Sequence, residues 1–511
     1  VSYAVRTQTA TMWPLAIFLV TYLFTQSQSQ CRVLDERQKL LERELAMMVG
    51  SSIKLSDSEL KANEIIMNYK NGEIQRGFKQ PNHFNLSKHF FGYKEEVKKT
   101  KLFQIIQSMP KGAVLHAHDT GLLSPDYVLA LTYWKDLWVC FTKHKSNVQF
   151  HFSKTTPGAP CGTHWKLMKN ARNASGDVAK FDADLRKHFS LVIDNPNEVY
   201  TDVNAVWKKF QQYFISTGNL FSYKPVYEKY YYDTLLEFRK DQVMYLEIRS
   251  TLPSLYDLKG NVFDAVETAA TYKRITEKFM RDYPDFYGAK LIYAPLKLVD
   301  KATLQEYIRI ALLIKRLMPD FLVGFDLVGQ EDLGVPLKEF AHELAEVRES
   351  LDLYLHAGET NWCGTSSDEN LFDAIVLGAK RIGHAFALIK HPLLMEEVKK
   401  RQIALEVNVV SNSVLKLVED PRNHPLANFL SQNMPVVLSS DDPGIWEALP
   451  MSHDFYVTFV AVANRHADLK LLKQLALNSL YYSSYPEKHK LVHAFEIRWT
   501  KFIDAIVKDK W

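Results

Sequence analysis

Four short segments of the chain place histidines and acidic residues at spacings that suit a single metal ion. They are His116-Ala117-His118-Asp119, His356-Ala357-Gly358-Glu359, Gly383-His384 and Ser440-Asp441-Asp442-Pro443. Alternate residues of a strand point to the same side, so His116 and His118 can bind one ion. Three imidazoles and a carboxylate suit zinc, a borderline ion that accepts nitrogen and oxygen. The predicted ligands of one zinc ion per chain are therefore His116, His118, His356 and Asp441.

Each segment taken alone has a simpler explanation. A single His-x-His is common on surface strands, and an Asp-Asp-Pro run is more often a turn or a helix cap. These explanations would have to hold separately at each segment, which favours a shared site. Zinc lowers the pKa of a coordinated water to about 7. Catalysis also needs an acid, a base and a group that orients the substrate, and Glu359, His384 and Asp442 are the residues left for these roles.

The segments follow short apolar runs, which alternate with longer amphipathic stretches. This pattern predicts a parallel α/β protein whose strands are covered on both faces. A (β/α)8 barrel with insertions is the predicted fold, although a doubly wound open sheet has the same local pattern. In a barrel the carboxyl ends of the strands share one mouth, where the segments would converge. The eight runs are 113–116, 244–248, 290–294, 321–327, 353–356, 381–384, 403–407 and 436–438.

The 511-residue chain also contains an extension before these runs and an insertion between the first two of them. Residues 31–100 read as a charged helical extension, in which Leu34, Leu41, Leu45 and Met48 form an apolar stripe that would pack on its own domain or on a partner subunit. The predicted barrel occupies 101–511. The gap between its first two runs is too long for one helix, so we expect an inserted subdomain at 125–187.

The N-terminal residues 1–30 resemble upstream sequence plus a secretory signal peptide. Residues 13–24 are mostly apolar and precede a polar stretch. The apolar segment is too short to span a bilayer comfortably. A buried helix or a membrane anchor is the alternative. No later segment is apolar enough to predict a membrane span in the mature chain. The net charge of +4 does not indicate a nucleic-acid binder, but it leaves acidic glycans open as partners.

Secretion bears on the cysteines and on glycosylation. The four cysteines form no Cys-x-x-Cys pair, so they do not suggest a thiolate metal site. Cys140 and Cys161 flank a segment that a disulfide would hold together, although two unrelated thiols remain the alternative. Asn85 and Asn173 each begin an Asn-x-Ser sequon. The state of Cys31 and Cys363 and the occupancy of the sequons stay open.

Five motifs in order together resemble the adenosine deaminase family, and in particular its secreted branch, the adenosine deaminase-related growth factors (type 2 adenosine deaminases). The motifs are MPKGAVLHAHD, FDLVGQED, LHAGETNWCGTSSDEN, RIGHAFAL and SSDDP. The resemblance runs from about residue 32 to the end of the chain. It implies a (β/α)8 metal-dependent amidohydrolase that hydrolyses adenosine and 2′-deoxyadenosine, and a homodimer formed through the N-terminal helices.

The resemblance also implies a role for each site residue. The zinc ligands would be the four residues named above. Glu359 would protonate N1 of the purine, and His384 would orient the attacking hydroxide and carry a proton. Asp442 would hydrogen-bond N7 of the purine, and the backbone N–H of Gly329 would meet N3. Asp119 would lie near the ribose, and Trp207 would form part of the wall of the pocket.

The sequence departs from the family pattern at several positions. Ala385 follows His384 where the family usually has glycine, and Asn408-Val409 replaces a usual Cys-Pro. Neither change removes a chemical group, so we expect activity. One rival hypothesis is deamination of adenine, AMP or a modified nucleoside at the same site. Another is a secreted growth factor or ligand of a cell-surface receptor whose catalysis is secondary or absent.

Overall fold

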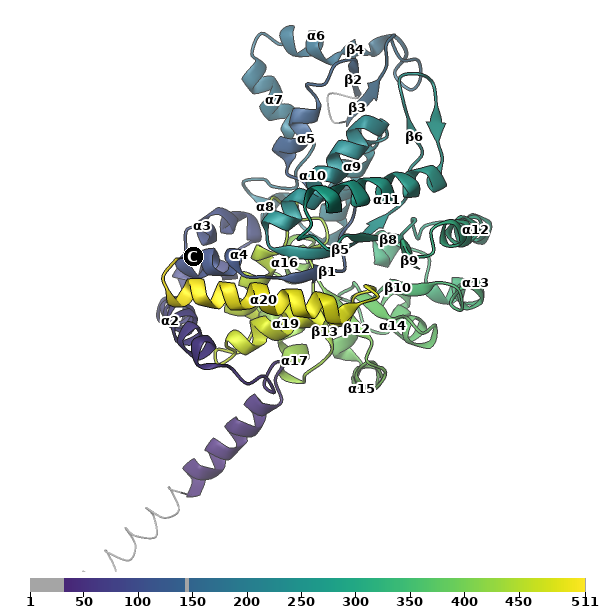
Figure 1. Ribbon diagram of the computed structural model, residues 1–511. Helices are drawn as coiled ribbons and strands as arrows, with labels where there is room; N and C mark the ends of the chain where they lie inside the picture. The colour runs from purple at the N-terminus through teal and green to yellow at the C-terminus, as the bar shows by residue number, and fades with distance from the viewer. Residues whose placement is uncertain (1–31, 143–146, 511) are drawn as a thin grey trace, which may run out of the picture.

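The computed structural model describes residues 32–142 and 147–510 (Figure 1). The predicted leader and Cys31 lie outside this range, so the structure does not bear on them. Within the described residues, no helix combines the length and the apolar character needed to cross a membrane.

Eight parallel strands form the central sheet in the order β1-β5-β8-β9-β10-β11-β12-β13. Just beyond β1 and β13, Ala117 pairs with Asp441 in a parallel bridge that brings the two edges of the sheet together. The predicted (β/α)8 barrel is thereby confirmed, and the alternative of a doubly wound open sheet is excluded. Each predicted apolar run supplies one strand. The strands are β1 Gly112–Val114, β5 Val243–Ser250, β8 Ala289–Tyr293, β9 Leu322–Phe325, β10 Asp352–Ala357, β11 Arg381–His384, β12 Ala404–Val407 and β13 Val436–Leu438.

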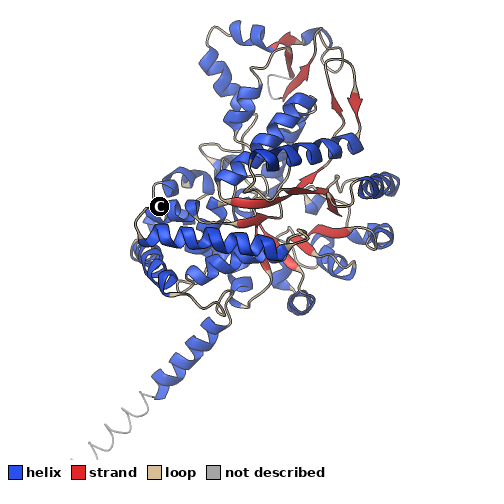
Figure 2. Ribbon diagram, viewed as in Figure 1, coloured by secondary structure: helices blue, strands red, loops and turns tan. Residues whose placement is uncertain are grey.

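Helices surround the barrel and cover the outer face of its strands (Figure 2). Asp264 and Glu267 form a capping box that starts α11, which satisfies backbone N–H groups at its first turn. Helix α19 packs across both β1 and β13 and so covers the junction between the first and the last strand. The helices from β5 onward are α11 Ala265–Asp282, α12 Lys301–Leu317, α13 Ala341–Val347, α14 Ser366–Val376, α15 Pro392–Arg401, α16 Val409–Val414, α17 Leu426–Ser431, α18 Ser452–Val457, α19 Leu469–Tyr481 and α20 Lys488–Val507.

The interior of the barrel contains charged side chains that pair with one another. Arg249 donates to Asp326 and to Glu406, and Arg381 donates to Glu247 and to Glu406. All five side chains are buried. Because each buried charge has a partner of opposite sign, removing one of them would leave the others uncompensated.

An insertion follows β1 and stands above the barrel at the top of Figure 1. Its strands form an antiparallel sheet in the order β3-β2-β4. Cys140 and Cys161 are joined in a disulfide, which confirms the predicted pairing. Helix α9 packs against β3, so contacts of the insertion continue past residue 187. The elements are α5 Pro125–Leu131, β2 Leu137–Thr142, β3 Asn147–Phe152, β4 Lys166–Leu167, α6 Met168–Asn173, α7 Val178–Arg186, α8 Pro196–Val199, α9 Val203–Phe221 and α10 Lys224–Lys240, with the small hairpin β6 Leu255–Tyr256 and β7 Val262–Phe263 after β5.

The N-terminal region divides into two parts. Residues 32–46 form a helix that projects away from the body, at the lower left of Figure 1. From the predicted apolar stripe, Leu34 is 60% exposed whereas Met48 is buried in the main core. Ala62 and Ile66 are also buried, because their helix packs against α20. The helices of this part are α2 Asp57–Lys79, α3 Lys94–Lys98 and α4 Lys101–Ser108.

Candidate metal centre and active site

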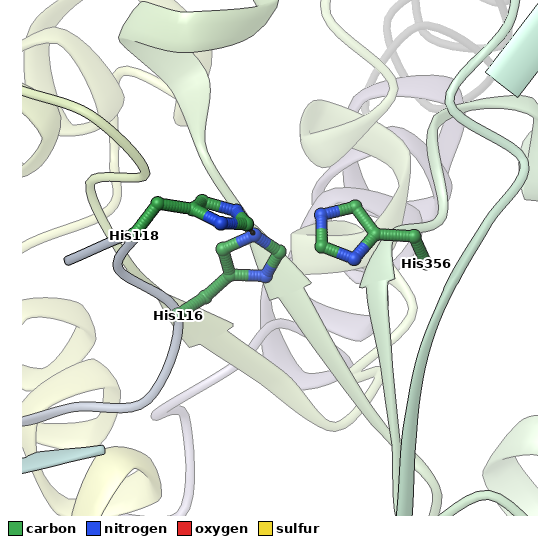
Figure 3. Close-up of side chains that lie close together, drawn as sticks. All are labelled: His116, His118 and His356. Atoms are coloured by element: carbon green, nitrogen blue, oxygen red, sulfur yellow. Dashed lines mark hydrogen bonds between the residues drawn. The ribbon is translucent and has the colours of Figure 1, made fainter. Parts of the chain in front are cut away.

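The predicted ligands converge at the carboxyl-terminal mouth of the barrel. His116 and His118 follow β1, His356 lies near the end of β10, and Asp441 follows β13. Potential ligand atoms of His116, His118 and His356 lie within 4.8 Å of one another, and Figure 3 shows their rings facing a common space. Residues that follow the first and the last strand of the barrel therefore lie side by side.

The separations between potential ligand atoms suit a small metal ion. His118 Nε2 lies 3.3 Å from His116 Nε2 and 3.1 Å from Asp441 Oδ1, and His116 Nε2 lies 3.5 Å from the same oxygen. Ligands that each lie about 2.0 to 2.1 Å from a tetrahedral zinc are about 3.3 Å apart. The donor set and its spacing fit zinc.

Carboxylates behind the histidines orient the ring nitrogens. His116 Nδ1 lies 2.8 Å from Glu406 Oε2, and His356 Nδ1 lies 2.7 Å from Asp326 Oδ2. Since Nδ1 of each ring bonds to a carboxylate, Nε2 is the atom left to face the centre. Burial alone would raise the pKa of Glu406, but Arg249, Arg381 and His116 hold that pKa well below its usual range.

Asp326 and Glu406 were not among the residues predicted for the site. The available signal was a charged residue inside an apolar run, since both lie within predicted strands. A buried carboxylate needs a partner that is charged or donates hydrogen bonds, and the predicted histidines are such partners. The pairing of Asp326 with His356 and of Glu406 with His116 is seen only in the folded barrel.

Glu359 is buried beside the histidines and is held through its own backbone. Its N–H donates to Glu331 Oε2 at 2.6 Å, and the N–H of Gly358 donates to the other oxygen of Glu331 at 3.0 Å. Burial, with the added repulsion of Asp441 and Glu331, raises the pKa of Glu359 well above its ordinary value. A carboxyl group with a raised pKa keeps its proton to higher pH, which suits Glu359 to act as a proton donor.

His384 lies between Glu359 and Asp441. Its Nδ1 is 3.5 Å from Glu359 Oε1, and its Nε2 is 3.9 Å from Asp441 Oδ2. Asn412 Nδ2 approaches Nδ1 to 3.1 Å. Burial lowers the pKa of His384 well below its usual value, so the neutral ring can accept a proton.

Asp442 carries a buried carboxylate oxygen, Oδ1, that has no hydrogen-bond partner among the described residues. Burial and the neighbouring Asp441 raise the pKa of Asp442 well above its ordinary value. A protonated Asp442 can donate a hydrogen bond to a ligand. Gly121 leaves room for this side chain, because a Cβ at Gly121 would lie 1.9 Å from Asp442 Oδ1.

The remaining predicted residues border the same region. Asp119 is buried and accepts hydrogen bonds from Tyr227 and Tyr272, at 3.1 and 2.6 Å. Gly329 has φ +121°, and an added Cβ there would meet no atom within 4 Å. Gln330, the next residue, donates to Asn204 of α9, which also carries the buried Trp207. This contact brings the start of α9 beside the loop of Gly329.

The departures from the family pattern lie close to the site. Ala385 is fully buried and has φ +49°, a left-handed conformation that favours glycine. Both polar atoms of the Asn408 side chain are buried without a hydrogen-bond partner among the described residues. Neither residue removes a chemical group from the cluster.

Comparison with known proteins decides the family. The model of the adenosine deaminase domain matches residues 179–497, and that of the adenosine/AMP deaminase N-terminal region matches residues 15–106. The chain belongs to the adenosine deaminase family. An adenosine deaminase of Lutzomyia longipalpis is 44% identical over 477 residues, 93% of this chain and 94% of the relative. Adenosine deaminase 2 of Homo sapiens is 38% identical over 499 residues, 96% and 97% of the two chains.

Solved structures of the adenosine deaminase fold support the same architecture. An adenine deaminase from Arthrobacter aurescens has a TM-score of 0.55 at 18% identity, covering 77% of this chain and 99% of that chain. An Arabidopsis N6-mAMP deaminase has a TM-score of 0.54, also at 18% identity, with coverage of 77% and 99%. These likenesses support the fold, whereas the family models and the relatives above confirm the family predicted from the five motifs.

Proposed function

We propose that this member of the adenosine deaminase family is a zinc-dependent hydrolase that converts adenosine and 2′-deoxyadenosine to inosine and 2′-deoxyinosine, with release of ammonia. The observation that carries the proposal is the convergence of the His116, His118, His356 and Asp441 cluster with the buried Glu359, whose pKa is raised by burial. The names of the similar deaminases supply the substrate. Replacement of an amino group by hydroxyl at C6 needs a nucleophile, an acid and a base at one point.

The four clustered ligands would hold the zinc ion. When bound, zinc supplies Lewis acidity, which makes water a competent nucleophile at neutral pH. The carboxylates of Asp326 and Glu406 keep the histidine rings in the orientation that this binding needs. Ser411 Oγ donates to Asp441 Oδ2 at 2.6 Å, which leaves Oδ1 facing the histidines.

Glu359 and His384 would transfer the protons. Attack at C6 breaks the aromaticity of the purine, so a proton must reach N1 as the new bond forms. Glu359, whose pKa is raised by burial, would donate that proton. Neutral His384 would accept a proton from the attacking water and pass it toward the departing amine. Their 3.5 Å separation supports this pairing, because one purine C6 could then lie within reach of both groups.

Asp442 and Gly329 would orient the purine. N7 carries a lone pair and needs a donor. Asp442 in its protonated form, which its raised pKa favours, would supply that donor through its unpartnered oxygen. The N–H of Gly329 would donate to N3 in the open space beside that residue. Asp119 would reach the ribose, and Trp207 would form part of the pocket wall.

The first experiment follows the loss of absorbance near the adenosine maximum when purified protein meets adenosine, with and without a zinc chelator. Chelator-sensitive conversion to inosine is the expected result. Parallel assays with adenine, AMP and N6-methylated nucleosides test the rival deaminations. No conversion by protein shown to contain zinc would favour another aminopurine or a binding protein that acts on a receptor.

We further propose a secreted, glycosylated homodimer with one zinc per subunit. The apolar leader, the Cys140–Cys161 disulfide and the sequons at Asn85 and Asn173 support secretion. The projecting helix of residues 32–46 supports the dimer, because its Leu34 and Leu40 are 60% and 62% exposed. The secreted chain could then also have growth-factor activity and could bind a cell-surface receptor or acidic glycans outside the cell.

The dimer is tested by deleting residues 32–46. Removing the whole of 31–100 would also expose the core, since Ala62 and Ile66 are buried in it. The short deletion should yield an active monomer by light scattering. An unchanged dimer would assign the interface elsewhere.

A further inference from the structure

A second group of potential metal ligands lies outside the barrel mouth. Cys363 is an exposed free cysteine on the loop after β10. Asp368 belongs to the first turn of α14, and His391 is the N-cap residue of α15. One ligand atom from each of these three side chains lies within 4.8 Å of the other two. None of them belongs to the histidine cluster.

Two of the three side chains are already held in position. Asp368 accepts the backbone N–H groups of Gly364 and Thr365, at 2.8 and 2.6 Å. His391 Nε2 lies 2.9 Å from Asp368 Oδ2, and its ring packs edge-on against Phe372. A bound ion would therefore order few additional atoms, which lowers the entropic cost of binding.

The donor chemistry selects the kind of ion. A thiolate, an imidazole and a carboxylate together suit zinc or a similar thiophilic divalent ion, and disfavour calcium and magnesium. On binding, the exposed thiol would lose its proton to solvent, and the proton of His391 Nε2 would leave that nitrogen for Nδ1 through solvent exchange. Water would complete the coordination. The imidazole and carboxylate atoms would separate from 2.9 Å to about 3.3 Å for tetrahedral zinc. This is a change within reach of a small side-chain rotation.

We propose that Cys363, Asp368 and His391 form a second, surface site for a zinc-like divalent cation. The site joins the loop after β10 to the segment that follows β11. Lys390 already connects these segments by donating to the carbonyl oxygens of Asn361 and Trp362. Glu359 lies on the first of these loops, and His384 ends β11. A bound ion would brace the two segments that carry the proposed proton-transfer groups.

The test measures metal content and thiolate coordination in the full-length protein. Protein equilibrated with micromolar free zinc should contain two ions per chain, and Cys363→Ser should lose one of them. Titration of the zinc-loaded protein with Cd2+ should give a thiolate charge-transfer absorption in the ultraviolet, absent from Cys363→Ser. His391→Gln should lose the same ion, whereas His342→Gln, at a histidine whose side chain is 80% exposed on α13, should keep both.

Two measurements of metal binding would overturn the second site. One is equal metal content in wild type and Cys363→Ser. The other is Cd2+ binding without the charge-transfer band. Cys363→Ser should retain wild-type activity at zinc concentrations that fill only the barrel site, which shows that the variant is folded. Loss of the barrel ion in this variant would also contradict the proposal, because the two clusters share no residue.

Discussion

Glu406 Oε2 binds Nδ1 of His116 at 2.8 Å and the guanidinium of Arg249 at 2.6 Å. One carboxylate oxygen thus connects a predicted zinc ligand to the charged interior of the barrel. Its charge strengthens the basicity of the ring and fixes the ring's orientation.

We predict that Glu406→Gln weakens zinc affinity by about tenfold to a hundredfold, because a neutral amide no longer polarises His116. Competition with a chromophoric chelator measures this, and added zinc should restore activity. Glu247→Gln is the matched control, since Glu247 pairs with Arg381 in the same interior but contacts no predicted ligand. An equal loss in both variants would assign the effect to barrel stability.

Glu359→Gln should retain zinc and lose turnover by at least about a hundredfold, because an amide cannot donate the proton that N1 needs. Metal analysis and steady-state kinetics separate the two effects. Glu339→Gln, at an exposed position, controls for loss of charge. Activity near that of wild type would remove Glu359 from the acid role.

Gly121→Ala should lower kcat/KM by about tenfold to a hundredfold, since the new Cβ would overlap Asp442 Oδ1 and displace it. Gly92→Ala is the control, because a Cβ there meets no atom within 4 Å. Substrates that lack N7 should lose less activity than adenosine does in the Gly121 variant. If adenosine and its 7-deaza analogue lose equal activity, Asp442 does not recognise N7.

The buried amine of Lys70 should make the free energy of unfolding depend on pH. Burial lowers the pKa of Lys70 to about 7, and the side chain donates to the carbonyl oxygens of Asn464 and Ala467. Between about pH 7 and pH 10 the unfolded chain holds a proton there that the folded chain does not. Stability should therefore rise with pH in this window, by up to about 1.4 kcal/mol per unit. Chemical unfolding at several pH values should show a smaller rise in Lys70→Met; parallel curves would contradict the assignment.

Ala385→Gly should stabilise the protein by about 1 kcal/mol, because φ +49° is costly for a residue with a Cβ. The larger entropy of glycine in the unfolded chain offsets part of this gain. Thermal unfolding of the zinc-loaded protein measures the difference. A destabilised variant would show that the buried methyl group contributes packing that outweighs the backbone strain.

The sequence predicted the barrel because most of the eight runs are nearly continuous in apolar residues and alternate with longer amphipathic stretches. It predicted the cluster because His116, His356, His384 and Asp441 each end or follow such a run. The carboxylates behind the rings escaped prediction, since only the folded barrel shows which histidine each of them contacts. For example, Glu406 contacts a histidine 290 positions earlier.

The N-terminal stripe shows a different limit. Helical spacing grouped Leu34 with Met48, but the helix described from residue 32 ends at residue 46. After that point the chain turns into the body, where the N–H of Val49 donates to the carbonyl of Leu430. Periodicity predicts which residues share a face only while the helix continues.

The bridge between Ala117 and Asp441 has a consequence for biosynthesis. A nascent chain that has left the ribosome only as far as β12 already contains His116, His118 and His356 but lacks Asp441. The carboxylate arrives only when β13, the last strand to be translated, docks beside the first. The growing polypeptide would therefore have no catalytic activity until its barrel had closed. The appearance of deaminase activity would mark the completion of folding.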